Sequence, residues 1–410
     1  MGSPLSKYFV AAGAKRLSQV EVRKEISNQH EFNGVLGFKE IFGSGRISFP
    51  AKFLYLADEE DDQVFDQGSL TWYDARENHP TRSEFRLYYS ANTVTGLAKE
   101  ADLVLIAKST EGFLLVVVCP SGSTHESQLL WLFGLEESER KFVIREYSDE
   151  KSELGYAGKM VISYLGLEIE EEEPDFLDDM IREFGLTFPS TAVFSRYARR
   201  TLPEKVSAAD APDEALMAWL EWEEALFRTL ERKIVGRKLS EGFGKDGLDV
   251  DDFVKFSLSV QNRRKSRAGY AFENHLAEVF DRNAIQYTRG AKTERNNKPD
   301  FLFPGIEQYF ATEFPTELLT MLGLKTTAKD RWRQVIPEAD RIPVKHLVTL
   351  EPAISSNQTE EMKIQKVQLV LPKPIMLTYT KAQQAGILTL SDFIGELRDK
   401  ENKRGEYPSI

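Results

Sequence analysis

The sequence of 410 residues contains one cysteine, Cys119, so no disulfide bond can form within the chain. A zinc site built from several cysteines is excluded for the same reason. The five histidines are scattered and lack the spacing of a histidine-based zinc or nuclease motif. Cys119 lies in the apolar run Phe113–Pro120, and we expect it to be a core residue.

Long apolar segments are also missing. No stretch approaches the roughly 18 to 20 apolar residues that a membrane-spanning helix needs. The N-terminus has no apolar region of the kind found in a secretory signal peptide. We therefore expect a soluble, intracellular protein in a reducing compartment.

The chain does not have an excess of basic residues. It carries 53 Lys and Arg against 65 Asp and Glu, which gives a formal net charge of −12. A protein that coats or packages DNA without specificity would be basic overall, so that class is disfavoured. An acidic shell around a locally basic cleft remains compatible with DNA binding. The length predicts two or three domains, each with a sizeable core.

The first part of the chain, to about Leu165, is rich in short apolar runs separated by turn residues, which predicts a small β-barrel or sandwich. The acidic run Asp58–Asp62 is expected to be a solvated loop. The runs expected to be strands are Val35–Phe38, Arg46–Phe49, Phe53–Leu56, Leu70–Tyr73, Phe85–Tyr89, Leu103–Ala107, Phe113–Cys119 and Leu129–Leu135.

The second part alternates helical and strand patterns. A charged stretch around Glu168–Glu173 marks the domain boundary. A helix with apolar residues at helical spacing is expected after Asp213, a candidate N-cap, and it carries either an ordinary core face or dimer contacts. Further helices are expected at Asp251–Leu258, Asn262–Leu276 and Ser391–Leu397. Strands of a mixed sheet are expected at Gln286–Thr288, Phe301–Phe303, Met321–Leu324, His346–Leu350 and Lys366–Leu371.

The stretch from Asn297 to Asp340 carries the chemistry. Asp300 follows Pro299 at the start of one apolar run, and Lys325 ends a second run. Two acids and a lysine on neighbouring elements are typical of a metal-dependent nuclease, in which carboxylates hold Mg²⁺ and the lysine lies beside the phosphate. In the commoner pattern an acid stands two residues before the lysine, but here that residue is Gly323. Glu338, on the helix expected to follow, is therefore the candidate second ligand.

A series of short motifs in this half of the chain resembles the catalytic domain of the EcoRII-type restriction endonucleases. The resemblance implies an α+β multidomain protein, with an N-terminal β-pseudobarrel that binds DNA and a C-terminal α/β domain of the PD-(D/E)XK type. With the charged boundary stretch, the expected domains are residues 1–165 and 186–410, with an acidic linker at 166–185. The motifs are Asn262–Gly269, Glu273, Lys298–Pro304, Thr312–Pro315, Lys325–Thr327, Lys329–Gln334 and Glu338–Asp340.

The same resemblance implies roles for individual residues. Glu338 fills the missing metal position beside Asp300, and Glu273 serves an outer-shell role toward metal or water. Tyr309 matches a tyrosine near the scissile phosphate, although a purely structural aromatic is the alternative. Pro337 departs from the family pattern and is expected to kink the helix before Glu338. Lys329, Asp330 and Arg331 are the expected readers of a site flanked by CC and GG, because Lys and Arg pair with guanine and a carboxylate accepts from cytosine.

Weaker similarity extends to the N-terminal domain of the same family. Lys15–Ser18 and Thr71–Tyr88 look like its two DNA-binding arms. The resemblance implies that Arg76, Arg82 and Arg86, together with Lys15 and Arg16, face DNA. The alternative is that these cations only make the surface soluble.

The expected function is that of a type II site-specific endonuclease from a prokaryotic restriction system for phage defence. It would cleave double-stranded DNA with Mg²⁺, leave 5′-phosphate ends, and act as a homodimer on a twofold-symmetric target. The cytoplasm, and the nucleoid during action, is the expected location. The N-terminal domain could restrain the active site. A nuclease that depends on modified bases, and a non-catalytic DNA-binding regulator, are the alternatives.

Overall fold

The computed structural model describes residues 4–22, 30–58, 63–136, 138–139, 141–147, 154–167 and 174–404, with backbone alone at 329–330. Most of the two predicted acidic runs, 59–62 and 168–173, lies outside these residues. The chain forms two compact units, Met1–Glu168 with Pro352–Thr359, and Ile169–Glu351 with Glu360–Ile410. Among the described helices, none is both long and apolar enough to cross a membrane.

The first unit is built on an eight-stranded sheet with the order β2-β5-β4-β3-β7-β6-β1-β8. All neighbouring strands are antiparallel except the parallel pair β3 and β7. The strands are β1 (Phe9–Arg16), β2 (Glu31–Phe32), β3 (Ile47–Tyr55), β4 (Val64–Asp74), β5 (Phe85–Tyr89), β6 (Leu103–Ser109), β7 (Leu114–Cys119) and β8 (Val143–Glu146). The helices are α1 (Gln19–Val22), α2 (Lys39–Phe42), α3 (Thr93–Leu97), α4 (Thr124–Phe133) and α5 (Tyr156–Tyr164). Cys119 is fully buried in this sheet, as predicted.

Two strand predictions for this unit were wrong, and two other predicted strands form one. Leu129–Leu135 lies mostly in α4, which Ser123 caps by accepting from the Glu126 amide. Val35–Phe38 contains a short 3₁₀ helix rather than a strand. The two runs on either side of Pro50 form one strand, because β3 pairs with β4 without interruption from Ile47 to Tyr55. Its pairing with β7 on the other side begins only at Ala51. Proline is tolerated there, where its missing N–H removes no bond to a second neighbour.

The second unit contains a six-stranded sheet with the order β14-β13-β12-β11-β10-β9. Strands β9 to β11 are antiparallel to one another, and β11 to β14 are parallel. This is a mixed α/β fold. The strands are β9 (Thr288–Arg289), β10 (Phe301–Phe303), β11 (Thr320–Lys325), β12 (Lys345–Thr349), β13 (Val367–Leu371) and β14 (Leu388–Thr389).

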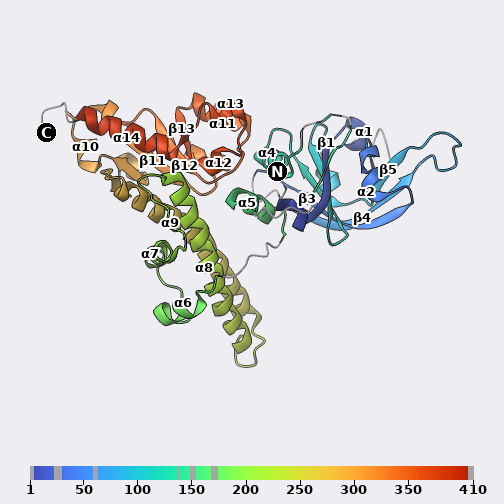
Figure 1. Ribbon diagram of the computed structural model, residues 1–410, viewed down its shortest axis with the longest axis horizontal. Helices are drawn as coiled ribbons and strands as arrows, with labels where there is room; N and C mark the ends of the chain where they lie inside the picture. Colours follow the sequence, from blue (N-terminus) through green and yellow to red (C-terminus); the bar gives the residue numbers. More distant parts are fainter. Residues whose placement is uncertain are drawn as a thin grey trace. The chain divides into compact units, whose positions relative to one another are not determined.

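Helices make up the rest of this unit. The two longest, α8 and α9, lie side by side as a hairpin that projects from the sheet (Figure 1). The residues predicted as two helices, 251–258 and 262–276, thus belong to the single helix α9. The helices are α6 (Leu177–Phe184), α7 (Thr191–Thr201), α8 (Pro212–Glu241), α9 (Val250–Arg282), α10 (Ile306–Phe310), α11 (Ser356–Ile364), α12 (Lys373–Met376), α13 (Lys381–Gln384) and α14 (Leu390–Arg404).

Two local predictions for the second unit also change. Asp213 is not the N-cap of α8, because Ala211 holds that position. The buried Asp213 carboxylate instead accepts from the amides of Lys373, Leu390 and Ser391, which lie at the starts of α12 and α14. The stretch predicted as linker at 166–185 contains α6, whose Met180 and Phe184 pack in an apolar cluster with residues of α7 and α8.

Candidate active site

Asp300 immediately precedes β10 and faces the end of β11. The register Phe301↔Leu322 brings it beside Gly323, and its Oδ2 accepts from the Leu324 amide at 2.6 Å. Burial raises the pKa of Asp300, while this hydrogen bond and the charge of Lys325 oppose the rise. A half-buried carboxylate is thus held at the edge of the sheet by a backbone donor.

Lys325 is the last residue of β11, as the sequence predicted for the end of the apolar run. Its positive charge lowers the pKa of both Asp300 and Glu338, so it interacts electrostatically with both acids. The three residues that the sequence singled out are therefore gathered at one place in the fold.

Glu338 reaches the site from a turn rather than from a helix, which corrects the prediction. The 3₁₀ helix Lys329–Val335 ends before Pro337, and the Glu338 amide donates to the Val335 carbonyl. A Cβ on Gly323 would lie 2.6 Å from the Val335 side chain and 3.7 Å from Glu338 Oε2. The space beside Gly323 is therefore taken by the Val335 and Glu338 side chains. Gly323, two residues before Lys325, has no side chain to fill this space, so the second acid can be supplied by the turn that carries Glu338.

The donor atoms present fit a hard divalent cation. Burial, and to a smaller extent the charge of Asp300, raises the pKa of Glu338 to about 7. Glu338 Oε2 is buried and has no hydrogen-bond partner among the described residues. Such an atom is costly unless something compensates it, and a cation would do so. The described residues contain no group of three or more His, Cys, Asp or Glu arranged as a metal site, but Mg²⁺ needs one or two carboxylates plus waters.

Glu273, on α9, lies at the edge of this group. It forms an ion pair with Arg289 of β9, and its charge raises the pKa of Asp300. Arg289 also donates to Asn274 at 3.0 Å. No sequence motif marks Arg289. Its place at the site depends on the pairing of β9 with β10, which puts Arg289 opposite Phe301.

Tyr309 lies in α10 and is almost fully buried. Its hydroxyl donates to the Glu294 carboxylate at 2.7–2.8 Å and accepts from the Arg341 amide at 3.2 Å. Burial and the Glu294 bond raise the pKa of Tyr309. The side chain that the resemblance placed near the phosphate is thus engaged in a structural network.

The predicted reading segment begins the 3₁₀ helix Lys329–Val335. Arg331 is exposed, whereas Trp332 is fully buried and anchors the segment to the core. The side chains of Lys329 and Asp330 lie outside the described residues. Of the three predicted readers, Arg331 is therefore the one whose side chain the structure shows to be exposed.

The N-terminal cations fall into two groups, and for two of them the structure corrects the prediction. Lys15 is buried and its Nζ pairs with Glu21 at 2.6 Å. Arg16 pairs with Glu126 at 2.5 Å and donates to the Ala101 carbonyl. Both side chains are engaged by carboxylates of the same unit, which makes them less available for a phosphate contact than an exposed, unpaired arginine.

The other three arginines lie on the hairpin between β4 and β5. Arg86 is mostly buried and pairs with Glu31 at 2.7 Å and with Glu84 at 2.8 Å. Arg76 is exposed and pairs with Glu84 at 2.6 Å. Arg82 is exposed, with no ion pair among the described residues. Arg82 is thus the best placed of the five for a DNA contact.

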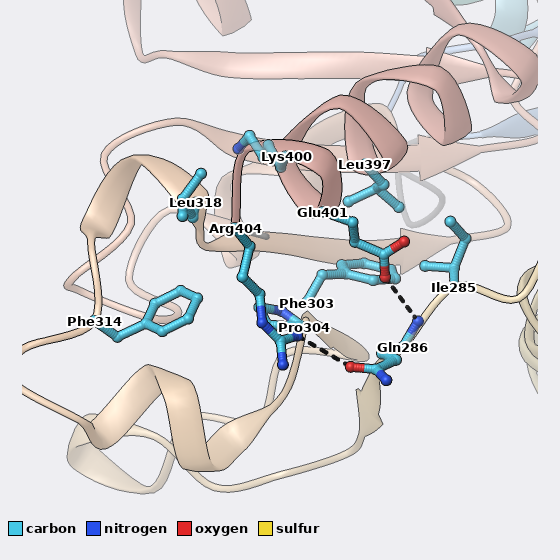
Figure 2. A pocket seen from close by; sticks show the side chains of 10 residues that line it. All are labelled: Ile285, Gln286, Phe303, Pro304, Phe314, Leu318, Leu397, Lys400, Glu401 and Arg404. Carbon is cyan, nitrogen blue, oxygen red and sulfur yellow. Dashed lines mark hydrogen bonds between the residues drawn. The ribbon is translucent and has the colours of Figure 1, made fainter. Parts of the chain in front are cut away.

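A hollow elsewhere in the second unit is separate from this site (Figure 2). Phe303, Phe314 and Leu318 form apolar walls, and Arg404 donates to the Gln286 side chain at 3.0 Å. Its lining shares no residue with the Asp300, Lys325 and Glu338 group. We therefore do not assign the reaction to it.

A pair of half-buried carboxylates beside a lysine, at the edge of a mixed sheet, defines a candidate site for metal-dependent hydrolysis. Residues 227–394 match the family model described as EcoRII C terminal. The chain is also 39% identical over 233 residues to the type II restriction enzyme EcoRII of Escherichia coli, covering 57% of this chain and 56% of that enzyme. Residues 227–394 are thus similar to the EcoRII C-terminal domain, and the chain is homologous to a type II restriction enzyme, which confirms the resemblance. The match spans little more than half the length of that relative.

Solved structures show weaker likeness. One is described as metal-depleted Ecl18kI in complex with uncleaved DNA, with a TM-score of 0.46, 19% identity, and coverage of 58% of this chain and 88% of that one. Another is a complex of the restriction endonuclease PspGI with substrate DNA, with a TM-score of 0.40, 15% identity, and coverage of 57% and 94%. At TM-scores below 0.5 these likenesses establish neither the fold nor the function of this chain.

Proposed function

We propose that this chain is a type II site-specific deoxyribonuclease that hydrolyses double-stranded DNA with Mg²⁺, leaving 5′-phosphate and 3′-hydroxyl ends. The carrying observation is the convergence of Asp300, Lys325 and Glu338 in a chain homologous to a restriction enzyme. An acid–lysine set that is complete favours an enzyme over a non-catalytic regulator. Incubating the full chain with plasmid DNA, methylated or not, and sequencing the ends tests this function and its dependence on base modification.

The roles of the residues follow from their positions. Asp300 and Glu338 would hold the cation, which when bound neutralises charge on the phosphate and favours ionisation of a water. The Lys325 ammonium would orient the attacking water and stabilise negative charge on the phosphate. Glu273 would keep Arg289 beside the site through their ion pair.

We propose a PD-(D/E)XK-type catalytic domain within residues 186–410 and a DNA-binding β-pseudobarrel within residues 1–165. A twofold-symmetric target flanked by CC and GG would require two active sites, hence a homodimer. Restraint of the active site by the N-terminal domain belongs to the same proposal.

Replacing Arg331 with alanine should weaken specific binding by roughly 1–3 kcal/mol, the usual contribution of a bidentate guanine contact. Binding to unrelated duplexes should change much less. Affinities of wild type and variant for specific and scrambled duplexes, at fixed salt, would measure the difference. An equal loss on every duplex would make Arg331 a phosphate contact instead.

Arg82→Ala should weaken DNA binding by the full chain and reduce the salt slope of binding by about one counterion. Lys15→Ala is the matched comparison, because its buried ion pair predicts loss of stability rather than a change in salt slope. Titrations at several salt concentrations, with melting temperatures for both variants, would check this. An unchanged salt slope for Arg82→Ala would show that Arg82 makes no phosphate contact, and the hairpin would no longer be assigned to the DNA-binding surface.

A further inference from the structure

The turn that carries Glu338 is tied on both sides to one distant segment. Asn297 Nδ2 donates to the Pro337 carbonyl at 2.6 Å, on the N-terminal side of Glu338. The Glu294 carboxylate accepts from the Asp340 amide at 3.3 Å, on the C-terminal side. The backbone around Glu338 is therefore fixed at two points by residues 294–297.

The segment that makes these contacts is itself fixed. The Thr293 amide donates to the Asn297 carbonyl at 2.9 Å and closes a tight turn. Arg295 forms an ion pair with Asp340, which adds a third link to the Glu338 turn. Three residues after Asn297 the same strand of chain reaches Asp300. The segment 294–297 is thus connected to both candidate metal ligands. It leads along the chain to Asp300, and it is hydrogen-bonded to the turn that carries Glu338.

Tyr309 is hydrogen-bonded to this segment through Glu294. Its buried hydroxyl donates to Glu294 and accepts from the Arg341 amide, so it links the 294–297 segment to the end of the Glu338 turn. It makes no hydrogen bond with Asp300, Lys325 or Glu338 among the described contacts. Its position is that of a support for Glu294.

Glu338 needs such support. One of its carboxylate oxygens is buried without a hydrogen-bond partner, and the negative charge of Asp300 repels it. A free turn would relieve both costs by swinging the side chain toward water. Contacts with the neighbouring backbone prevent this movement without occupying the oxygens that a cation would use.

We propose that Glu294 and Asn297 are positioning residues that hold Glu338 next to Asp300 for a divalent cation, and that Tyr309 acts through Glu294. The inference rests on the proposed function, in which these two carboxylates bind the cation. It assigns Tyr309 a structural route to activity in place of contact with the scissile phosphate.

The test is a Mn²⁺ titration of the full chain, following the electron paramagnetic resonance signal of the free ion. Asn297→Ala and Glu294→Ala should each weaken Mn²⁺ binding by about tenfold, the usual lower range for lost outer partners of metal ligands. Glu294→Gln keeps an oxygen acceptor for the Asp340 amide and should recover most of the affinity. Glu307→Ala, at an exposed position of α10, and Asn402→Ala, at an exposed position of α14, are the matched controls and should bind Mn²⁺ as wild type does.

Tyr309 is tested by a double-mutant cycle. If Tyr309 acts through Glu294, then Tyr309→Phe with Glu294→Ala should weaken Mn²⁺ binding no more than Glu294→Ala alone. Fully additive losses would overturn that part of the proposal. Full Mn²⁺ affinity in Tyr309→Phe, combined with lost DNA cleavage, would instead indicate that Tyr309 contacts the scissile phosphate.

Melting temperatures separate misfolding from mispositioning. If Asn297→Ala does not fold, Asn297→Asp keeps the shape while removing the Nδ2 donor, and it should still weaken Mn²⁺ binding. Wild-type affinity in folded Asn297 and Glu294 variants overturns the inference. Absence of both Mn²⁺ binding and DNA cleavage in the wild type overturns the proposed function itself.

Discussion

Replacing Asp300 with alanine should abolish DNA cleavage, with a loss of about a thousandfold or more, because several kcal/mol of charge stabilisation in the transition state disappear. Asp300→Asn is the sharper variant, since its amide oxygen can still accept from the Leu324 amide while its charge is gone. It should fold at least as well as wild type, because burial disfavours the charged form of Asp300. Lys325→Ala should lose cleavage to a comparable extent.

Cleavage of plasmid DNA at saturating Mg²⁺, with binding measured in Ca²⁺, would separate lost chemistry from lost affinity. Lys381→Ala, at an exposed position in α13, is the control for removal of a positive charge. Near wild-type cleavage by any of the Asp300 or Lys325 variants would show that the reaction lies elsewhere.

Glu338→Gln should combine loss of cleavage, by roughly a hundredfold or more, with a gain in stability. Folding raises the pKa of Glu338 from its ordinary 4.5 to about 7 through burial. The folded state therefore binds a proton more tightly than the unfolded state does. In wild type without metal, this group costs no stability below about pH 4.5, and the cost grows until pH passes about 7. It amounts to about 3.5 kcal/mol at most, since the shift is about 2.5 pKa units and one unit is about 1.4 kcal/mol.

Denaturant unfolding at several pH values, with and without Mg²⁺, would measure this effect. The free energy of unfolding of wild type should fall relative to that of Glu338→Gln between pH 4.5 and 7. Mg²⁺ should restore wild-type stability at high pH and have little effect on the variant. Parallel pH curves for the two proteins would contradict the assignment of a buried, uncompensated carboxylate.

Sequence reasoning succeeded where local pattern determines structure. The apolar runs at Phe301–Phe303 and Met321–Leu324 predicted β10 and β11 because both strands are buried. Gly323 indicated that an acid had to come from another element. Pro337 indicated a break in the backbone before Glu338, although the predicted helix there is a turn. The homology then confirmed the resemblance that the motifs carried.

It failed where partners distant in the chain decide the outcome. Asp213 has the sequence context of an N-cap, but its carboxylate accepts hydrogen bonds from three backbone amides of elements later in the chain. Lys15 reads as a surface cation until Glu21 is seen to pair with it. The run Leu129–Leu135 has the apolar composition of a strand, but the cap signal Ser123-x-x-Glu126 that starts α4 decides its structure.

The division of the chain into units has a consequence for dissecting the protein. Residues Pro352–Thr359 follow β12 and precede β13, yet they belong to the first unit, so the polypeptide passes between the units three times. Within that unit, Gln128 donates to the Pro352 carbonyl at 3.0 Å and Gln358 donates to Asp58 at 3.3 Å. A fragment that stops near residue 165 therefore lacks a piece of its own fold. Cutting the chain once does not yield two intact halves, and a faithful separation would need the 352–359 peptide supplied in trans.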